Sequence, residues 1–288
     1  MDISLIGGDA RIGMLAETAA HKGNRVLCCG LDMYGFGEGC LLTDSTRVAI
    51  RSSKVIILPL PVSRDGINLF APLSYFGIKL DDITKYLGEE KIVLGGMINK
   101  EYQKEMEKTG AKVIDYFERE ELNILNAVST IEGALEIAMH ETDTTVFDSD
   151  VLVVGYGRLG KVAANRFDAM GAKVTVTARK KSDLAWINVG GYNSINTKDI
   201  YKYIGGYNII INTVPHIVLG EKELSKAEKG TIIIDLASQP GGTDFEFAAK
   251  RGIKAIAALS LPGKVAPKSA ATVIFDTISG ILDEYNLE

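Results

Sequence analysis

The sequence is poor in the residue types that build metal centres and disulfide frameworks. Its 288 residues include only 3 cysteines and 3 histidines. Cys28, Cys29 and Cys40 show no CxxC spacing and have no companion histidine. We therefore expect reduced thiols in a protein core, with no metal site and no disulfides.

Long hydrophobic runs and an excess of positive charge are also missing. No segment approaches the roughly 20 apolar residues of a membrane span. The opening residues, MDISLIGGDA, lack the basic start and apolar core of a signal peptide. The formal net charge is −5 and no cluster of lysine and arginine stands out, which argues against a nucleic-acid surface. We expect a cytoplasmic protein with neither a membrane nor a nucleic acid as its partner.

The most informative stretch is Asp150–Lys181, DVLVVGYGRLGKVAANRFDAMGAKVTVTARKK. It reads as a β-branched strand, a glycine-rich turn, a helix and a second strand. In such a unit Gly155 makes the tight turn, Gly157 lets the backbone approach a pyrophosphate, and Gly160 lets helix and strand pack closely. The pattern predicts a dinucleotide whose phosphates lie at the helix N-terminus.

The end of the second strand distinguishes the two nicotinamide dinucleotides. A carboxylate there would bind the ribose hydroxyl of NAD, whereas an arginine accommodates the 2′-phosphate of NADP. The chain has Arg179, Lys180 and Ser182 before its first acid, Asp183. We therefore expect NADP rather than NAD, the alternative being that these cations form only a solvated turn.

The first residues repeat this unit in altered form. When the two copies are aligned without a gap, Asp9 falls where the second copy has Gly157, and Ile12 where it has Gly160. A carboxylate would repel a pyrophosphate and an isoleucine would hold helix and strand apart. The first copy is thus expected to keep the fold without the nucleotide, which leaves its loop free to face a substrate.

Further apolar runs alternate with helical patterns along the whole chain, as in parallel α/β sheets. Apolar residues recur at helical spacing from Arg119 to about His140, and Pro267 is placed to begin a last helix that returns to the first domain. We predict an α/β protein with two doubly wound, Rossmann-like domains and an active-site cleft between them. The expected boundaries are 1–119 plus 267–288 for the substrate domain, and 120–266, including a bridging helix 120–141, for the NADP domain.

Ligands of such sheets bind in the loops at the carboxyl ends of the strands. The nucleotide is therefore expected to contact the glycine turn, the end of the following strand and three later loops. The residues concerned are Gly155, Tyr156, Gly157, Arg158, Leu159, Gly160, Ala178, Arg179, Lys180, Ser182, Thr213, Val214, Pro215, Leu236, Ala237, Ser238 and Pro262. His216 is a candidate catalytic residue, the alternative being that it contacts only the cofactor or solvent.

Several motifs together resemble the dipicolinate synthase A-subunit family over essentially the full length. They are Ile6–Arg11, Ser129–Gly133, Gly155–Gly160, Asp235–Asp244 and Leu261–Lys268. The resemblance implies oxidation of dihydrodipicolinate, or of a hydroxytetrahydro precursor, to pyridine-2,6-dicarboxylate. It also implies NADP as hydride acceptor, a partner chain that is a flavoprotein-like B subunit, and a place in the mother cell of a sporulating bacterium, on a branch of lysine biosynthesis. The family pattern implies an arginine where this chain has Gln239, which puts a cationic contact there in doubt.

A small dicarboxylate substrate requires hydrogen-bond donors at both ends. The expected substrate residues are Gly8, Asp9, Arg11, Pro61, Val62, Ser63, Arg64, Ser129, Thr130, Gly241, Gly242, Thr243, Lys264 and Lys268. Glu132 is the candidate for taking the ring proton. The sequence is also compatible with a homo-oligomer.

Two other functions stay open at this point. The chain could be a 2-hydroxyacid or amino-acid dehydrogenase, although the hydroxyacid enzymes need a histidine after the last strands and 258–267 contains none. It could also be a non-catalytic nucleotide-binding scaffold that a partner chain completes.

Overall fold

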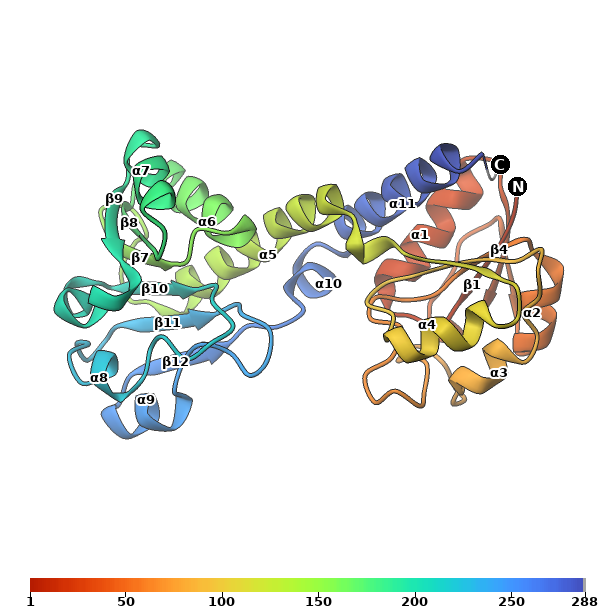
Figure 1. Ribbon diagram of the computed structural model, residues 1–288, viewed down its shortest axis with the longest axis horizontal. Coiled ribbons are helices and arrows are strands. Elements are labelled where there is room, and N and C mark those ends of the chain that lie inside the picture. The colour runs from red at the N-terminus through yellow and green to blue at the C-terminus, as the bar shows by residue number, and fades with distance from the viewer. Residues whose placement is uncertain (287–288) are drawn as a thin grey trace. The chain divides into compact units, whose positions relative to one another are not determined.

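The computed structural model describes residues 1–286, which divide into two compact units. The first unit comprises Met1–Asn126 together with the residues from Ala266 onward, and the second comprises Ala127–Val265. Each unit contains one six-stranded parallel sheet with helices beside it, which confirms the predicted fold class (Figure 1).

The first unit is built from alternating strands and helices and is completed by the last helix of the chain. Its elements are β1 (Asp2–Ile6), α1 (Ala10–His21), β2 (Arg25–Cys29), β3 (Cys40–Thr43), α2 (Thr46–Ser52), β4 (Val55–Ile57), α3 (Leu80–Thr84), β5 (Ile92–Gly95), α4 (Lys100–Glu107), β6 (Lys112–Asp115), a 3₁₀ turn (Tyr116–Glu118), the start of α5 (Glu120–Glu141) and α11 (Pro267–Glu284).

The second unit begins within α5 and repeats the same alternation. Its further elements are β7 (Asp150–Val154), α6 (Arg158–Ala169), β8 (Lys173–Ala178), α7 (Lys181–Val189), β9 (Asn193–Asn196), 3₁₀ turns (Thr197–Lys202 and Ile204–Gly206), β10 (Ile209–Asn212), α8 (Glu221–Leu224), β11 (Ile232–Asp235), α9 (Phe245–Arg251), β12 (Lys254–Ala257) and α10 (Leu261–Val265).

The two sheets have the same topology. The strand orders are β3-β2-β1-β4-β5-β6 and β12-β11-β10-β7-β8-β9, which is one doubly wound order written in two directions. The strand order therefore reverses between β1 and β4 in the first sheet and between β7 and β10 in the second. Such switch points are where open parallel sheets bind ligands, at the carboxyl ends of the strands.

Alternate side chains of each central strand pack on opposite faces of the sheet. In β1, Ile3 and Leu5 join a core with α1 and α11, whereas Ile6 faces the core under α2 and α3. Ser4 points to this second face, where its hydroxyl donates to the Ala49 carbonyl at 2.7 Å. Both faces of the strands are buried, which explains their nearly continuous apolar runs.

The last helix packs within the first unit. Pro267 stands in the first turn of α11, where its missing N–H costs no hydrogen bond. Ile274, Phe275 and Ile278 are buried in the core that also holds Leu15 of α1. The end of the chain thereby returns beside its beginning, as the neighbouring α11 and α1 in Figure 1 show.

Two edge strands were not predicted from the sequence. In β3 the two central residues, Leu41 and Leu42, are exposed, and β9 has the polar sequence NSIN. Neither has the buried β-branched run from which the other strands were identified. The predicted long helix and last helix are confirmed as α5 and α11.

The three cysteines are free, with Cys28 and Cys29 buried and Cys40 half-buried. Within residues 1–286, no group of three or more histidine, cysteine, aspartate or glutamate side chains could hold a metal ion. In the same part of the chain, no helix combines the length and the apolar character needed to cross a membrane.

Candidate dinucleotide site

The glycine turn of the second unit follows β7 directly at the switch point. Gly155 has φ +100, a conformation that favours glycine, and its N–H is shared between the carbonyl and the hydroxyl of Thr177, at 3.2 and 3.3 Å. A Cβ atom at Gly155 would lie 2.5 Å from Oγ1 of Thr213, which follows β10. Thr213 itself donates to the Val154 carbonyl at 2.8 Å. The two loops at the switch point thus hold each other in place.

The other two glycines have different surroundings. A Cβ atom at Gly160 would lie 2.1 Å from the carbonyl oxygen of Gly155, so only glycine lets α6 approach the turn this closely. A Cβ atom at Gly157 would meet nothing within 4 Å. Gly157 is the N-cap of α6, and no side chain caps this helix. The start of α6 therefore combines open space with helix N–H groups, which suits the pyrophosphate of a dinucleotide.

The end of β8 presents uncommitted cations. Arg179, Lys180 and Ser182 are exposed, and within residues 1–286 none of their side chains forms a hydrogen bond or an ion pair. Lys180 is the N-cap of α7 and makes no capping bond. Ala178, at the end of the strand, is buried. An anionic group could bind here without displacing an existing partner.

A buried carboxylate organises the loops that follow β10 and β11. Asp235, 2% exposed, accepts hydrogen bonds from Nδ2 of Asn212 at 2.9 Å, from the Ala237 N–H at 3.0 Å and from the Gly242 N–H at 3.0 Å. Asn212 in turn accepts from the N–H of Val214 at 3.2 Å. One carboxylate thus fixes both loops that approach the glycine turn.

Gly242 is required at this junction. A Cβ atom there would lie 2.3 Å from the Val214 carbonyl oxygen and 2.4 Å from Nδ2 of Asn212. The sequence reasoning named Asp235 only as the first residue of a family motif and assigned it no role in the site. An acidic residue closing a buried IIID run at a strand end is the signal that would have identified it.

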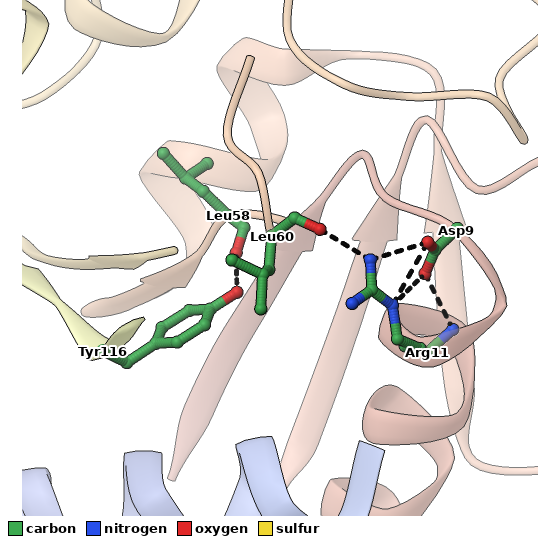
Figure 2. Close-up of polar contacts among 5 residues, drawn as sticks. All are labelled: Asp9, Arg11, Leu58, Leu60 and Tyr116. Carbon is green, nitrogen blue, oxygen red and sulfur yellow. Dashed lines mark hydrogen bonds and ion pairs between the residues drawn. The ribbon is translucent and has the colours of Figure 1, made fainter. Parts of the chain in front are cut away.

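The first unit has an ion pair where the second has open space. Asp9 is the N-cap of α1, and its Oδ1 and Oδ2 accept hydrogen bonds from Nε and Nη2 of Arg11 at 3.0 and 2.8 Å. Nη2 also donates to the carbonyl of Leu60, which follows β4, at 2.6 Å. Figure 2 shows the guanidinium between the Asp9 carboxylate and Leu60. The sequence predicted that Arg11 is free for a substrate, but most of its donors are already engaged.

The rest of this switch point is also filled. The Gly8 N–H donates to the Phe70 carbonyl at 2.8 Å. A Cβ atom at Gly7 would lie 2.5 Å from the Leu69 side chain, and one at Gly8 would lie 2.4 Å from that of Ile12. The isoleucine that replaces the third glycine thus covers the turn. Of the two switch points, only the one in the second unit leaves room for a pyrophosphate at its glycine turn.

Tyr116, directly after β6, holds the segment just before Leu60. Its buried hydroxyl donates to the Leu58 carbonyl at 3.0 Å (Figure 2). Burial raises the pKa of Tyr116 well above its ordinary value, so the hydroxyl remains a donor. Leu58 and Leu60, on either side of Pro59, are therefore both held through their carbonyl groups.

The loop after β4 is stabilised by its own side chains. Ser63 donates to the Asn68 carbonyl at 2.6 Å and accepts from the Gly66 N–H at 3.0 Å, so its hydroxyl is engaged. Hydrogen bonds from the N–H groups of Asn68 and Ile67 lower the pKa of Asp65. Arg64 is exposed, with its guanidinium 4.2 Å from the centre of the Phe70 ring.

The remaining candidates differ in accessibility. Val62 is 1% exposed and its side chain belongs to the core, so its place among the expected substrate residues stays a prediction for its backbone. Glu132 and His216 are exposed, and within the described residues neither side chain has a hydrogen-bond or ion-pair partner. Buried are Gly8, Ser129, Thr243, Gly241, Gly242, Leu236, Ala237 and Pro262; half-buried are Pro61, Thr130, Tyr156, Leu159, Thr213 and Val214; exposed are Arg158, Pro215, Ser238, Lys264 and Lys268.

The two sheets match two different protein-family models. Residues 2–117 match the N-terminal domain of the dipicolinate synthase A subunit. Residues 126–282 match the alanine dehydrogenase/PNT C-terminal domain. The second sheet thus has the fold of a dehydrogenase that binds a nicotinamide dinucleotide.

Individual relatives match over the whole chain. The chain is 32% identical to the dipicolinate synthase A subunit of Bacillus subtilis, over 100% of this chain and 98% of the relative. The crystal structure of the dipicolinate synthase A subunit from Bacillus halodurans superimposes with a TM-score of 0.89 at 31% identity, covering 98% of this chain and 97% of that one. A transhydrogenase from Sinorhizobium meliloti, 16% identical, shares the fold with a TM-score of 0.72 over 99% of this chain and 94% of its own.

Proposed function

Since the chain belongs to the dipicolinate synthase A-subunit family, we propose that it oxidises a dihydrodipicolinate-type dicarboxylate to pyridine-2,6-dicarboxylate, with NADP as the hydride acceptor. The main support for the proposal is that the glycine turns at the two switch points differ in the space they leave for a ligand. The glycine turn of the second unit is open at Gly157, whereas the equivalent turn of the first unit is filled by Asp9, Arg11 and Ile12. The coenzyme then binds to the second unit and the acid to the first.

The choice of NADP rests on the end of β8. Arg179 and Lys180 are exposed and unpaired within residues 1–286, and no acid precedes Asp183. A guanidinium can bind a phosphate through two parallel hydrogen bonds, and the uncapped start of α7 adds a favourable helix dipole. A carboxylate that would bind the ribose hydroxyls of NAD is missing at this position.

Substrate binding is proposed for the carboxyl edge of the first sheet. Arg11 uses Nε and Nη2 for Asp9 and Leu60, so Nη1 is the group left for a substrate carboxylate. Arg64 and Lys268, exposed cations of the same unit, are proposed to bind the other carboxylate. Gln239 supplies a neutral amide where the family resemblance implied an arginine, so this chain relies more heavily on the other cations.

The proposed reaction does not require a strong general acid or base from the protein. When bound, the nicotinamide would accept the hydride. Loss of hydride and a proton makes the ring of the product aromatic, so an exposed carboxylate is sufficient to take the proton. We assign this role to Glu132, with His216 as the alternative; both side chains are accessible.

The relatives' name contains the word subunit, which supports a partner chain. We propose a flavoprotein-like B subunit for this partner and place the complex in the mother cell during endospore formation. A homo-oligomer of this chain within such a complex is part of the same proposal.

The test is turnover by the purified chain, with and without the B subunit. Dihydrodipicolinate and NADP should yield reduced coenzyme and pyridine-2,6-dicarboxylate in equal amounts, and NAD should be a poorer acceptor. Oxidation or reduction of a 2-oxo acid or amino acid, without any response to dihydrodipicolinate, would contradict the proposal. So would a B subunit that performs the whole reaction while this chain binds no coenzyme.

A further inference from the structure

Met97, immediately after β5, adopts a backbone conformation that its side chain disfavours. Its φ is +55, and the other non-glycine residues with positive φ between residues 1 and 286 are Asp148, Ser260 and Asn286. Aspartate and asparagine adopt this conformation more readily than methionine, because their short polar side chains can bond locally. A methionine here is therefore unusual and calls for a physical reason.

Asp115 holds the backbone in this shape. Its Oδ1 accepts a hydrogen bond from the Met97 N–H at 3.1 Å, and its Oδ2 accepts one from the Ile98 N–H at 2.8 Å. A carboxylate that binds two successive N–H groups fixes the turn whatever residue stands at the first position. The fold itself would be served at least as well by glycine, which adopts positive φ without strain.

The turn at Met97 is joined to the loop that Arg11 holds. The Gly96 N–H donates to the Pro59 carbonyl at 3.1 Å, and the Val62 N–H donates to the Gly96 carbonyl at 2.9 Å. Because β1, β4 and β5 are neighbours in the sheet, Arg11, Leu60 and Met97 follow three adjacent strand ends. Met97 therefore belongs to the same edge as the guanidinium proposed to bind a substrate carboxylate.

The Met97 side chain contributes little to the core. It is 55% exposed, although it is apolar and its backbone is strained. Strained residues that packing does not need are concentrated at functional sites, where the structure around them maintains the strain. The position on the ligand-binding edge of a parallel sheet agrees with this interpretation.

We infer that Met97 contacts the substrate, with its thioether against the face of the dicarboxylate ring. The inference rests on the proposed function, which supplies the ring. A thioether makes favourable contacts with aromatic rings, and the unbranched side chain can adapt as a puckered dihydro ring becomes flat. Arg11 would then bind a carboxylate while Met97 distinguishes a planar ring from an open-chain diacid.

The test uses the full chain with methionine methyl groups labelled with carbon-13, titrated with pyridine-2,6-dicarboxylate. The Met97 methyl signal, assigned by its loss in Met97→Leu, should move upfield as the ring covers it. The signal of Met139, an exposed methionine of α5, serves as the internal control and should stay in place. In Met97→Gly the affinity for the diacid should fall about tenfold, whereas the melting temperature should not fall and the affinity for NADPH should not change.

The outcomes separate the inference from the function on which it rests. If the unmodified chain does not bind pyridine-2,6-dicarboxylate, the proposed function fails and the inference fails with it. If the unmodified chain binds the diacid, but the Met97 signal is unmoved and Met97→Gly binds equally well, only the inference is overturned. A fall in melting temperature with unchanged affinity would assign Met97 a purely structural role.

Discussion

The Asp9 carboxylate and the Arg11 guanidinium form a two-point ion pair at the first turn of α1, with side chains that are 27% and 11% exposed. In the second unit the residue that corresponds to Asp9 is Gly157, around which a Cβ atom would find nothing within 4 Å. At this position of the repeated motif, Gly157 leaves open space at the start of its helix, whereas Asp9 supplies a negative charge that is already paired within the protein. In the proposed function, the two copies of the fold divide coenzyme and acid between them.

Arg11→Lys should destabilise the first unit by about 1–3 kcal/mol, because an ammonium cannot bond Asp9 and Leu60 with the same fixed geometry. Urea unfolding monitored by circular dichroism measures the change. Arg25→Lys is the matched control. The Arg25 side chain is 86% exposed and its Nε lies 3.4 Å from Oδ1 of Asp2, so this substitution should change the free energy of unfolding by less than about 0.5 kcal/mol. Equal effects of the two substitutions would show that the Arg11 contacts add nothing to stability.

Arg179→Asp should weaken NADPH binding roughly 10- to 100-fold, since it removes a charge-assisted bond and adds a repulsive charge. The affinity for NADH should stay the same or improve. Fluorescence titration with both reduced coenzymes measures the ratio. Lys229 is an exposed lysine just before β11, at the amino-terminal ends of the strands of the same sheet. Lys229→Ala should therefore leave both affinities unchanged. If Arg179→Asp leaves NADPH affinity intact, the proposed 2′-phosphate site is wrong.

Asp235→Asn should lower the free energy of unfolding by about 1–3 kcal/mol although it preserves the shape of the side chain. The carboxylate now accepts hydrogen bonds from the N–H groups of Ala237 and Gly242. In the variant the amide nitrogen, itself a donor, would face one of these N–H groups, and that hydrogen bond would be lost. Hydrogen exchange at Gly242 should quicken and NADPH affinity should fall, because the two loops beside the glycine turn share this anchor. Unchanged exchange at Gly242 would argue against the anchoring role.

Because Cys28 and Cys29 are buried, we expect the free energy of unfolding to depend on pH in the alkaline range. Burial raises the pKa of Cys29 from 9.0 to about 11 and raises that of Cys28 as well. A folded-state pKa above the unfolded one means that stability is complete below about pH 9 and is lost as the pH rises toward the folded value. Urea unfolding should therefore show a loss of up to about 1.4 kcal/mol per pH unit for each thiol above that point. Cys29→Ala should reduce this slope, and an identical slope in the variant would assign the effect to other groups.

Much of the fold was predictable because the buried strands have a simple signal. Runs such as VLVV in β7 and III in β11 are apolar on both faces, as parallel strands between two layers of helices must be. The edge strands β3 and β9 lacked this signal, since the two central residues of β3 are exposed and β9 has the polar sequence NSIN. Periodicity cannot identify a strand whose side chains are not buried.

The candidate site was predictable to a smaller extent. The glycine pattern located the turn after β7 because each glycine serves a backbone requirement that depends on local sequence. The fate of Arg11 could not be predicted in the same way, since its bond to Leu60 joins segments far apart in the chain. The role of Asp235 was missed because its three donors are Asn212, at the end of β10, and Ala237 and Gly242, in the loop after β11.

NADPH titration of Gly157→Ala, together with its melting temperature, tests the central claim most directly. A methyl group at Gly157 meets no protein atom, so the variant should melt at the same temperature as the unmodified chain while its affinity for NADPH falls at least about tenfold. Gly160→Ala, whose methyl group would press on the Gly155 carbonyl, should lose both stability and binding. A stable Gly157→Ala variant that binds NADPH as tightly as the unmodified chain would show that the coenzyme does not lie on this turn.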